Sequence, residues 1–252
     1  MSILDALDID FGEDVNHAIR VPVVILADVS GSMEPLMSNL NQALRGFLTS
    51  LKNDAVASKS AELCVVAFDH ESKVMLDFNT VGDIDRMPEL MSGGATFTGK
   101  ALRIGIDLCA SRKAYYQEEG FDYYQPWLVM MTDGQPSVLD PAWLDQMKLR
   151  GMDSNDVFLT SELSEIKKTK IELHDLINDK KINFINIAIG DDADLDYLKS
   201  LHPANRAFKM TADTDFAKFF EWLGKSVKAK SNSQKGDAVK TAPMSEAGLD
   251  IC

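Results

Sequence analysis

Cysteine is scarce in this chain of 252 residues, and the few cysteines lie far apart. There are three, an odd number that includes no CxxC pair: Cys64, Cys109 and Cys252. Zinc ribbons need such pairs, and disulfide frameworks need an even set at regular spacings. The sequence therefore argues against both kinds of structure.

Long apolar segments are absent as well. The longest strongly apolar stretch, residues 21–27, contains Pro22 and is much too short to cross a bilayer. The first 14 residues carry five acidic side chains, whereas a secretory signal has a basic start followed by a long apolar stretch. We therefore expect a soluble, cytoplasmic protein that begins with an acidic segment over residues 1–19.

Positive charge is in deficit, because 26 Lys and Arg residues stand against 39 Asp and Glu residues, a formal net charge of −13. Binding to nucleic acid requires a basic surface that neutralises phosphates, and docking on an anionic membrane requires the same. We expect neither partner. A negative balance attracts cations, metal ions included, and it also serves solubility.

The motifs of several enzyme classes are missing too. The chain has no GxxxxGK[ST] phosphate loop, which argues against nucleotide hydrolysis. No histidine pairs with a serine or cysteine in a recognisable motif, which argues against a hydrolase triad; the four are His17, His70, His174 and His202. A phosphoryl-accepting Asp28 of the haloacid-dehalogenase kind would need a second Asp two residues on, where this chain has Ser30. We expect no enzymatic activity.

The chain does contain an alternation of short apolar runs and amphipathic stretches. The length fits one α/β domain or two small ones, and the 45% hydrophobic content can bury a sizeable core. We predict strands over residues 21–29, 61–68, 74–78, 126–132, 183–189 and 207–210. Helices are predicted over residues 36–51, 99–116, 161–180, 194–201 and 215–230. This order implies a mostly parallel sheet covered by helices on both faces, with one antiparallel edge strand at 74–78.

Two stretches stand apart from the domain that we place at residues 20–230. Residues 134–160 are too long for an ordinary connection and are predicted to be an insertion near the site described below. Inside it, Asp140 followed by Pro141 predicts the start of a short helix that ends near Arg150. Residues 231–252 are polar without a periodic apolar face, which predicts a flexible tail.

Oxygen-bearing side chains follow three of the predicted elements. Asp28, Ser30 and Ser32 stand at the end of the first strand, where alternate residues point the same way. Thr96 follows a Gly-Gly turn before the second long helix, and Asp133 follows the strand that ends at residue 132. In open parallel sheets such strand-end loops meet at one edge, so we expect these five side chains to converge.

Five oxygen donors without a histidine or cysteine are typical of a hard cation, and they argue against zinc and copper. We therefore predict Mg²⁺ as the cofactor, with Ca²⁺ and Mn²⁺ as alternatives. If one carboxylate reaches the ion only through water, the ion stays electrophilic and favours a carboxylate from another protein. The Asp-x-Ser-x-Ser segment alone could instead be a helix cap and turn, since Asp and Ser prefer such positions.

The segments DVSGSM, GGATFTGKAL and MTDGQP together resemble the metal-ion-dependent adhesion site of von Willebrand factor A domains. The resemblance covers about residues 20–228 and implies a Rossmann-like fold, metal-dependent protein binding and no catalytic activity. It also implies the ligand set Asp28, Ser30, Ser32, Thr96 and Asp133. Thr96 is preferred to Thr98 because it directly follows the glycine turn.

Residues 112–115 and 123–127, which run into the MTDGQP segment, are more narrowly similar to the bacterial TerY/YegL branch, named for tellurite resistance. That resemblance implies a protein kinase or a PP2C-type phosphatase as partner. One alternative is a metal-independent scaffold subunit that uses the 134–160 insertion and the tail. We expect Trp143, Leu144 and Met147 of the insertion to lie beside the metal.

Overall fold

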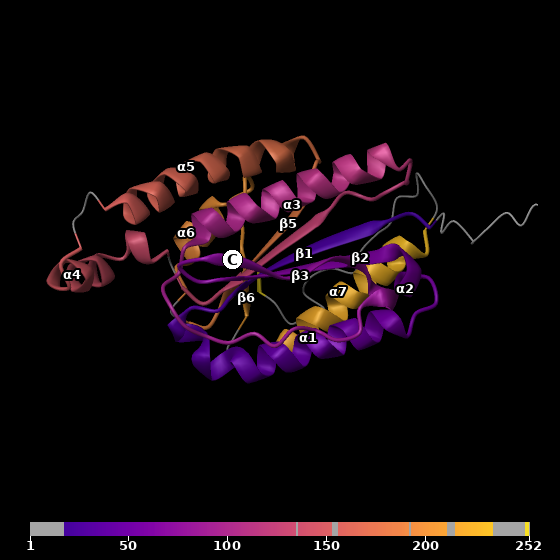
Figure 1. Ribbon diagram of the computed structural model, residues 1–252, viewed down its shortest axis with the longest axis horizontal. Coiled ribbons are helices and arrows are strands. Elements are labelled where there is room, and N and C mark those ends of the chain that lie inside the picture. Colours follow the sequence, from indigo (N-terminus) through magenta and orange to yellow (C-terminus); the bar gives the residue numbers. More distant parts are fainter. Residues whose placement is uncertain are drawn as a thin grey trace, which may run out of the picture.

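A seven-stranded sheet forms the centre of the protein, and helices cover both of its faces (Figure 1). The computed structural model describes residues 18–134, 136–152, 156–191, 193–210, 215–233 and 250–251. The strands are β1 (Val21–Asp28), β2 (Ala61–Phe68), β3 (Ser72–Thr80), β4 (Trp127–Thr132), β5 (Asn183–Ile189), β6 (Phe208–Met210) and β7 (Asp250–Ile251).

The strand order is β3-β2-β1-β4-β5-β6-β7. Strands β2, β1, β4, β5 and β6 are parallel, and β3 pairs antiparallel with β2 at one edge. The predicted α/β fold with a mostly parallel sheet and an antiparallel edge strand is therefore confirmed. The two-residue strand β7 adds an antiparallel pairing with β6 at the other edge, which no apolar run in the sequence had indicated.

The helices divide between the two faces of the sheet (Figure 1). Their bounds are α1 (Met37–Lys52), α2 (Ala57–Ser60), α3 (Thr98–Glu118), α4 (Pro141–Leu149), α5 (Val157–Asn178), α6 (Leu195–Ser200) and α7 (Asp215–Ser231). The described residues also include the 3-10 helices η2 (Gly31–Leu36), η3 (Val81–Asp83) and η4 (Ser137–Leu139). Helices α1, α2 and α7 cover one face, α3, α5 and α6 cover the other, and α4 projects from one end.

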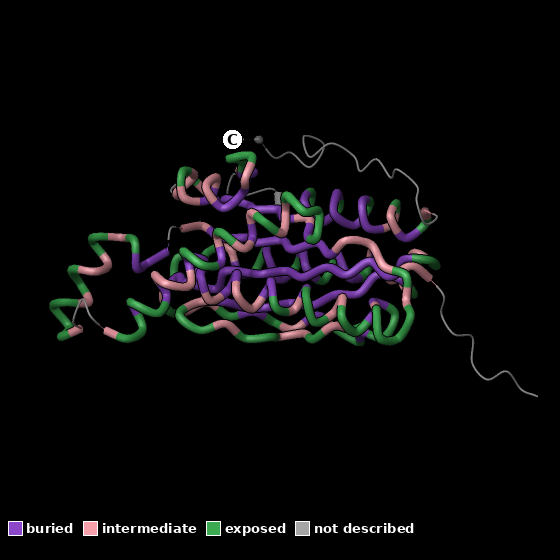
Figure 2. Tube along the Cα trace, turned by 90° about the horizontal axis from the view of Figure 1, so that it is seen from above, coloured by how far each residue is buried: buried purple, intermediate pink, exposed green. Residues whose placement is uncertain are grey.

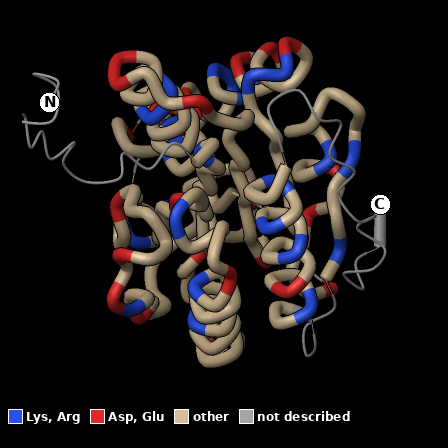
Figure 3. Tube along the Cα trace, turned by 90° about the vertical axis from the view of Figure 1, so that its right-hand side faces the viewer, with Lys and Arg blue, Asp and Glu red and all other residues tan. Residues whose placement is uncertain are grey.

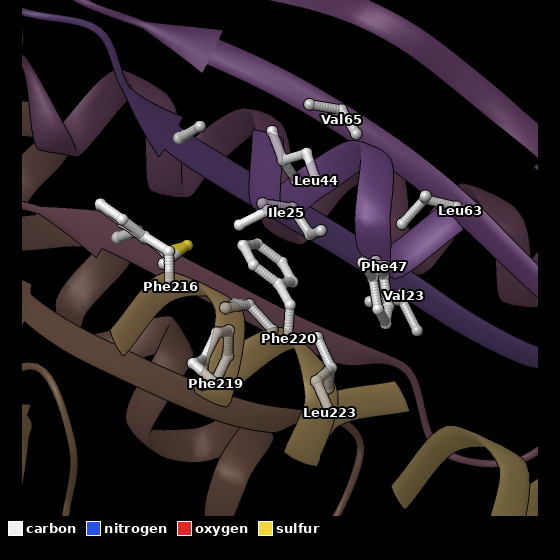
Figure 4. Close-up of a cluster of buried hydrophobic side chains, with 14 of the residues drawn as sticks. Val23, Ile25, Leu44, Phe47, Leu63, Val65, Phe216, Phe219, Phe220 and Leu223 are labelled. Atoms are coloured by element: carbon white, nitrogen blue, oxygen red, sulfur yellow. The ribbon is translucent and has the colours of Figure 1, made fainter. Parts of the chain in front are cut away.

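The continuous apolar sequence of the central strands follows from burial on both faces. Every residue of β1, β2 and β4 is buried (Figure 2). On the α1 and α7 side, Phe47 and Phe220 meet with ring centroids 5.3 Å apart above Val23 and Ile25 of β1 (Figure 4). Burying each such side chain stabilises the fold by about 1.5–3 kcal/mol, so these layers hold the strand ends in fixed positions.

The end of the sheet where β1 and β2 begin is closed by a charged and aromatic cluster. Arg112 Nε lies 2.6 Å from Glu62 Oε2, and Arg20 Nε lies 3.8 Å from Glu62 Oε1. The buried Tyr116 donates its hydroxyl hydrogen to Glu62. Seen from the end opposite α4, acidic and basic residues are interspersed along the chain (Figure 3). The contacts of Glu62 with Arg20, Arg112 and Tyr116 therefore stabilise this end of the sheet.

Several sequence predictions concern the ends of the chain. Helix α7 continues to Ser231 and residues 250–251 join the sheet, while residues 234–249 and 252 of the predicted tail lie outside the described residues. The predicted acidic segment lies outside them too, except for residues 18–19. Within the described part of the chain, none of the helices is both long and apolar enough to cross a membrane.

Candidate metal centre

The end of β1 presents the first three predicted ligands. Asp28 is the last residue of β1 and is fully buried, and its Oδ1 accepts a hydrogen bond of 2.8 Å from the backbone N–H of Ser30. The chain then turns into the 3-10 helix η2, which begins at Gly31 and carries Ser32. The hydroxyl oxygens of Ser30 and Ser32 lie 3.1 Å apart. Asp28 and both serines therefore belong to one hydrogen-bonded turn.

The end of β4 brings the second carboxylate to the same place. Strands β1 and β4 are parallel and pair Ala27 with Met131, so the residues that follow are neighbours at the edge. Thr132 donates its hydroxyl hydrogen to Asp28 Oδ2 over 2.5 Å, and Ser32 donates to Asp133 Oδ1 over 2.9 Å. Side chains that are 101 residues apart in the chain, Ser32 and Asp133, are thus in direct contact.

The loop that carries Thr96 is attached to the β1 turn through its backbone. Gly31 N–H donates to the Gly94 carbonyl over 3.1 Å, and Gly93 N–H donates to the Val29 carbonyl over 2.7 Å. Gly94 has φ +80°, and a Cβ there would come within 2.7 Å of Asp69 Oδ2, so no other residue fits this turn without strain. Thr96, which follows the turn, is buried beside the carboxylates' loops.

Burial determines the electrostatics of both carboxylates. Desolvation raises the pKa of Asp28 from 3.8 to about 6, although the hydrogen bonds from Thr132 and Ser30 oppose this rise. Desolvation also raises the pKa of Asp133. The fully buried Asp28 and the partly buried Asp133 lie near each other, so a counter-charge favours their being ionised together. A divalent cation supplies that counter-charge.

The donor set fits a hard divalent ion by its chemistry. Asp28 and Asp133 supply carboxylate oxygens, and Ser30, Ser32 and Thr96 carry hydroxyls on the adjoining turns, the ligand types that Mg²⁺ and Ca²⁺ prefer. Among the residues that the structure describes, no group of three or more His, Cys, Asp and Glu side chains could hold a metal ion. An alternative site of the softer, nitrogen- and sulfur-rich type is thus not offered by that part of the chain.

Two residues that hydrogen-bond to the proposed ligands, Thr132 and Ser137, were not predicted from the sequence. Thr132 fixes Asp28, as described above, and Ser137 of η4 holds the Thr96 backbone in a reciprocal pair. The Thr96 N–H donates to Ser137 Oγ over 2.9 Å, and the Ser137 N–H donates to the Thr96 carbonyl over 2.9 Å. Both contacts join residues that are far apart in the chain, so no local pattern in the sequence indicated them. The sequence showed only that Thr132 and Ser137 lie close to Asp133.

The predicted insertion begins at this same edge. Its helix α4 starts as expected, with Asp140 accepting a hydrogen bond from the Ala142 N–H and Pro141 in the first turn. Trp143 of α4 packs edge-on against Phe97, with ring centroids 6.4 Å apart, one residue after Thr96. Because η4 also holds Thr96, the insertion and the Thr96 loop form one structural unit.

Comparisons with known proteins identify the fold. Among solved structures, the vWF domain of the type V pili tip protein Mfa5 from Porphyromonas gingivalis matches with a TM-score of 0.57 at 12% identity, covering 88% of this chain and 98% of that chain. The pilus adhesin SpaC from Lactobacillus rhamnosus GG matches with a TM-score of 0.56 at 15% identity, covering 84% of this chain and 30% of that chain. No curated protein sequence gives a significant match.

Proximal thread matrix protein 1 from the mussel byssus, in a structure with a zinc-occupied MIDAS motif, matches with a TM-score of 0.50 at 18% identity, covering 83% of this chain and 48% of that chain. The chain thus spans about half the length of the mussel protein. The sequence model of the von Willebrand factor type A domain matches residues 23–222. Proteins with this domain are mostly non-enzymatic adhesion or interaction modules. The chain therefore belongs to the von Willebrand factor type A domain family.

Proposed function

We propose that this protein is a non-enzymatic interaction module that binds a partner protein through a divalent metal ion. Asp28, Ser30, Ser32, Thr96 and Asp133 hold the ion in this proposal, and Mg²⁺ is the expected species. The observation that carries the proposal is the continuous set of hydrogen bonds from Asp28 through Ser30 and Ser32 to Asp133. It joins the end of β1 to the residue that follows β4.

The chemistry of the site favours binding over catalysis. When bound, the metal ion supplies a positive charge that attracts a carboxylate oxygen of the partner. The chain's own residues orient that charge: Thr132 and the Ser30 N–H fix the Asp28 carboxylate, and Ser32 fixes Asp133. The site offers no histidine within this hydrogen-bonded set that could move a proton to or from a substrate. An Asp or Glu side chain is therefore the expected ligand from the partner.

A finer assignment within the family rests on the sequence alone. Residues 112–115 and 123–127 are similar to the bacterial TerY/YegL branch, and on that basis we propose a bacterial, cytoplasmic protein linked to tellurite resistance. A protein kinase or a PP2C-type phosphatase is the partner that this similarity implies. Co-purification of a kinase or phosphatase with the full chain tests this assignment independently of the metal.

A metal-independent scaffold is the alternative function, and one observation favours it. Helix α4 of the insertion projects from the end of the molecule and has no buried residue, so it offers surface for a subunit contact that needs no ion (Figure 2). A pull-down in EDTA separates the two functions. Retention of the partner in EDTA favours the scaffold, and loss followed by rescue with Mg²⁺ favours the metal-dependent module.

Calorimetric titration with Mg²⁺ tests the ligand assignment directly. Asp28→Ala and Asp133→Ala should each remove measurable Mg²⁺ binding while circular dichroism shows an intact fold. The matched control is Asp191→Ala, which removes an exposed carboxylate that follows β5 and pairs with Lys209 at 2.7 Å. Unchanged Mg²⁺ affinity in the first two variants would refute the assigned ligands, and a loss in the control would indicate a site elsewhere.

A further inference from the structure

A groove runs between α4 and the loop that carries Thr96. Its volume is about 500 Å³, and its walls come from Gly94 and Ala95, from α4, and from the start of α5. Its lining includes the polar side chains of His70 and Arg150 and the apolar side chains of Phe97, Trp143, Met152 and Phe158. Most of them are apolar, so the groove suits apolar groups of a ligand.

Among the described residues, several apolar side chains of α4 and α5 near the groove are exposed. Phe158, at the start of α5, is 63% exposed, and the adjacent Val157 is 78% exposed. Leu149, in the last turn of α4, is 89% exposed. Exposed apolar residues that gather beside a groove mark an interaction site more often than scattered ones do. This face is therefore built to be covered by another molecule.

Positive charge borders the same apolar walls. Arg150 lines the groove, and Lys100 Nζ lies 5.1 Å from the centroid of the Phe97 ring and 5.2 Å from that of the Phe158 ring. These cations stand out in a chain with a formal net charge of −13. Cations at the border of an apolar groove complement a ligand that is apolar and acidic together.

The groove adjoins the loop that carries Thr96 of the candidate metal centre. Gly94 and Ala95 form one of its walls and immediately precede Thr96. The Gly94 carbonyl accepts the hydrogen bond from Gly31 N–H, between the two serines of the β1 turn. A peptide whose carboxylate lies at the metal centre therefore has the groove directly beside it.

We propose that the groove binds an apolar side chain of the same partner segment whose acidic residue binds at the metal centre. The occupant is an acidic, apolar peptide segment of a partner protein, with an aromatic or long aliphatic side chain close in sequence to an Asp or Glu. This inference rests on the proposed function and deepens it, because the metal accepts any carboxylate whereas the groove selects among the segments that carry one.

Selection from a phage-displayed library of random peptides tests the proposal. The bait is the full chain in Mg²⁺, and the expected winners carry Asp or Glu near Phe, Trp, Leu or Met. A synthetic winning peptide should bind Phe158→Asp and Arg150→Glu about tenfold or more weakly than the parent protein, while both variants keep the parent's Mg²⁺ affinity. The control is Ile171→Asp, an equally exposed position on α5 about 20 Å further along the helix, which should bind normally.

The outcomes separate this inference from the proposed function. The groove proposal is refuted if no peptide is selected, if the selected peptides show no apolar preference, or if they bind the groove variants normally. Each of these results refutes it independently of whether the protein binds Mg²⁺. Winners that bind Asp28→Ala normally yet fail on Phe158→Asp retain the groove and refute the metal bridge. If light scattering shows that the chain self-associates and Phe158→Asp abolishes this self-association, the groove binds a second copy of the chain. The proposal of a partner segment is then refuted.

Discussion

Asp28 is both fully buried and, at neutral pH, ionised, and without a cation burial disfavours the charge. It is buried at the end of β1, and the resulting desolvation raises its pKa from 3.8 to about 6. At neutral pH the carboxylate is therefore ionised in a place that disfavours the charge. Thr132 and the Ser30 N–H offset part of this cost by donating hydrogen bonds to its two oxygens. The remaining cost lowers the stability of the metal-free protein, and a cation at the proposed site would offset it.

Asp28→Asn should accordingly stabilise the metal-free protein at pH 7. The folded protein keeps the Asp28 proton up to about pH 6 and the unfolded chain only up to 3.8, so stability falls as the pH rises through this window. The difference corresponds to about 3 kcal/mol, and the amide removes the charge while keeping the shape. Urea unfolding in EDTA at pH 4 and pH 7 measures the effect. A variant less stable than the parent at pH 7 would contradict it.

Metal affinity should fall in acid for the same reason. Protons compete with Mg²⁺ for Asp28 below about pH 6, and burial raises the pKa of Asp133 in the same direction. We expect Mg²⁺ to bind about tenfold or more weakly at pH 5 than at pH 7. Calorimetry at pH 5 and pH 7 measures the Mg²⁺ affinity. Repeating it in buffers of different ionisation enthalpy measures the number of protons released on binding. Equal affinities with no proton release would show that Asp28 is not a ligand.

At the scale of elements, helix α5 positions the Thr96 loop by clamping the start of α3. Glu162 of α5 is buried and accepts hydrogen bonds from the backbone N–H groups of Gly99, at 2.5 Å, and Lys100, at 3.0 Å. Helix α3 has no capping side chain of its own, so this carboxylate satisfies its first donors. Burial raises the pKa of Glu162, which the two hydrogen bonds oppose.

Gly99 permits this close approach, and a matched pair of glycine variants should show it. A Cβ at Gly99 would lie 2.6 Å from the Ile166 backbone nitrogen, so Gly99→Ala must separate α3 from α5. We expect a loss of about 1–3 kcal/mol in urea unfolding. Gly46, exposed in α1, would place a Cβ in open space, and Gly46→Ala should add about 0.5–1 kcal/mol. Equal effects of the two variants would contradict the close contact.

Much of the element order could be predicted because burial on both faces requires continuous apolar runs. Strands β2 and β5 have the predicted bounds, 61–68 and 183–189. Strand β3 extends from Ser72 to Thr80 rather than over 74–78, because an edge strand tolerates polar residues that hide its ends. Helix α5 begins at Val157, four residues earlier than predicted, since Asp156 caps it by accepting from the Phe158 N–H at 2.8 Å.

The proximity of Asp28, Ser30, Ser32 and Asp133 could be predicted from the sequence, but the contacts that support these residues could not. Strand ends and glycine turns are visible in one sequence, and they led to the two carboxylates and the three hydroxyls. The contacts from Thr132 to Asp28, from Ser137 to Thr96 and from Glu162 to Gly99 join residues 104, 41 and 63 positions apart. No local pattern specifies such pairs, because they depend on how the helices and strands pack in three dimensions.

At the scale of the whole molecule, the parallel sheet has a closed, packed end and an opposite end that carries the candidate site. The end where β1 and β2 begin is closed by the Arg20, Glu62, Arg112 and Tyr116 cluster. The other end gathers the β1 turn, the Thr96 loop, Asp133 and the α4 insertion. Because β1, β2 and β4 are buried over their full length, the loops at this end can carry polar groups without weakening the core.

Mg²⁺ should therefore stabilise the whole fold and not merely a loop. The proposed ligands come from the end of β1 and the turn after it, from the loop before α3 and from the residue after β4, so the site exists only when these parts are assembled. At a Mg²⁺ concentration of about 100 times the dissociation constant, binding should add about 2.7 kcal/mol to the free energy of unfolding. Urea titration should show a higher midpoint in Mg²⁺ than in EDTA with an unchanged slope, and no difference for Asp28→Asn. If the urea midpoint of the parent protein is the same in Mg²⁺ and in EDTA, the converging oxygens do not bind the ion in solution.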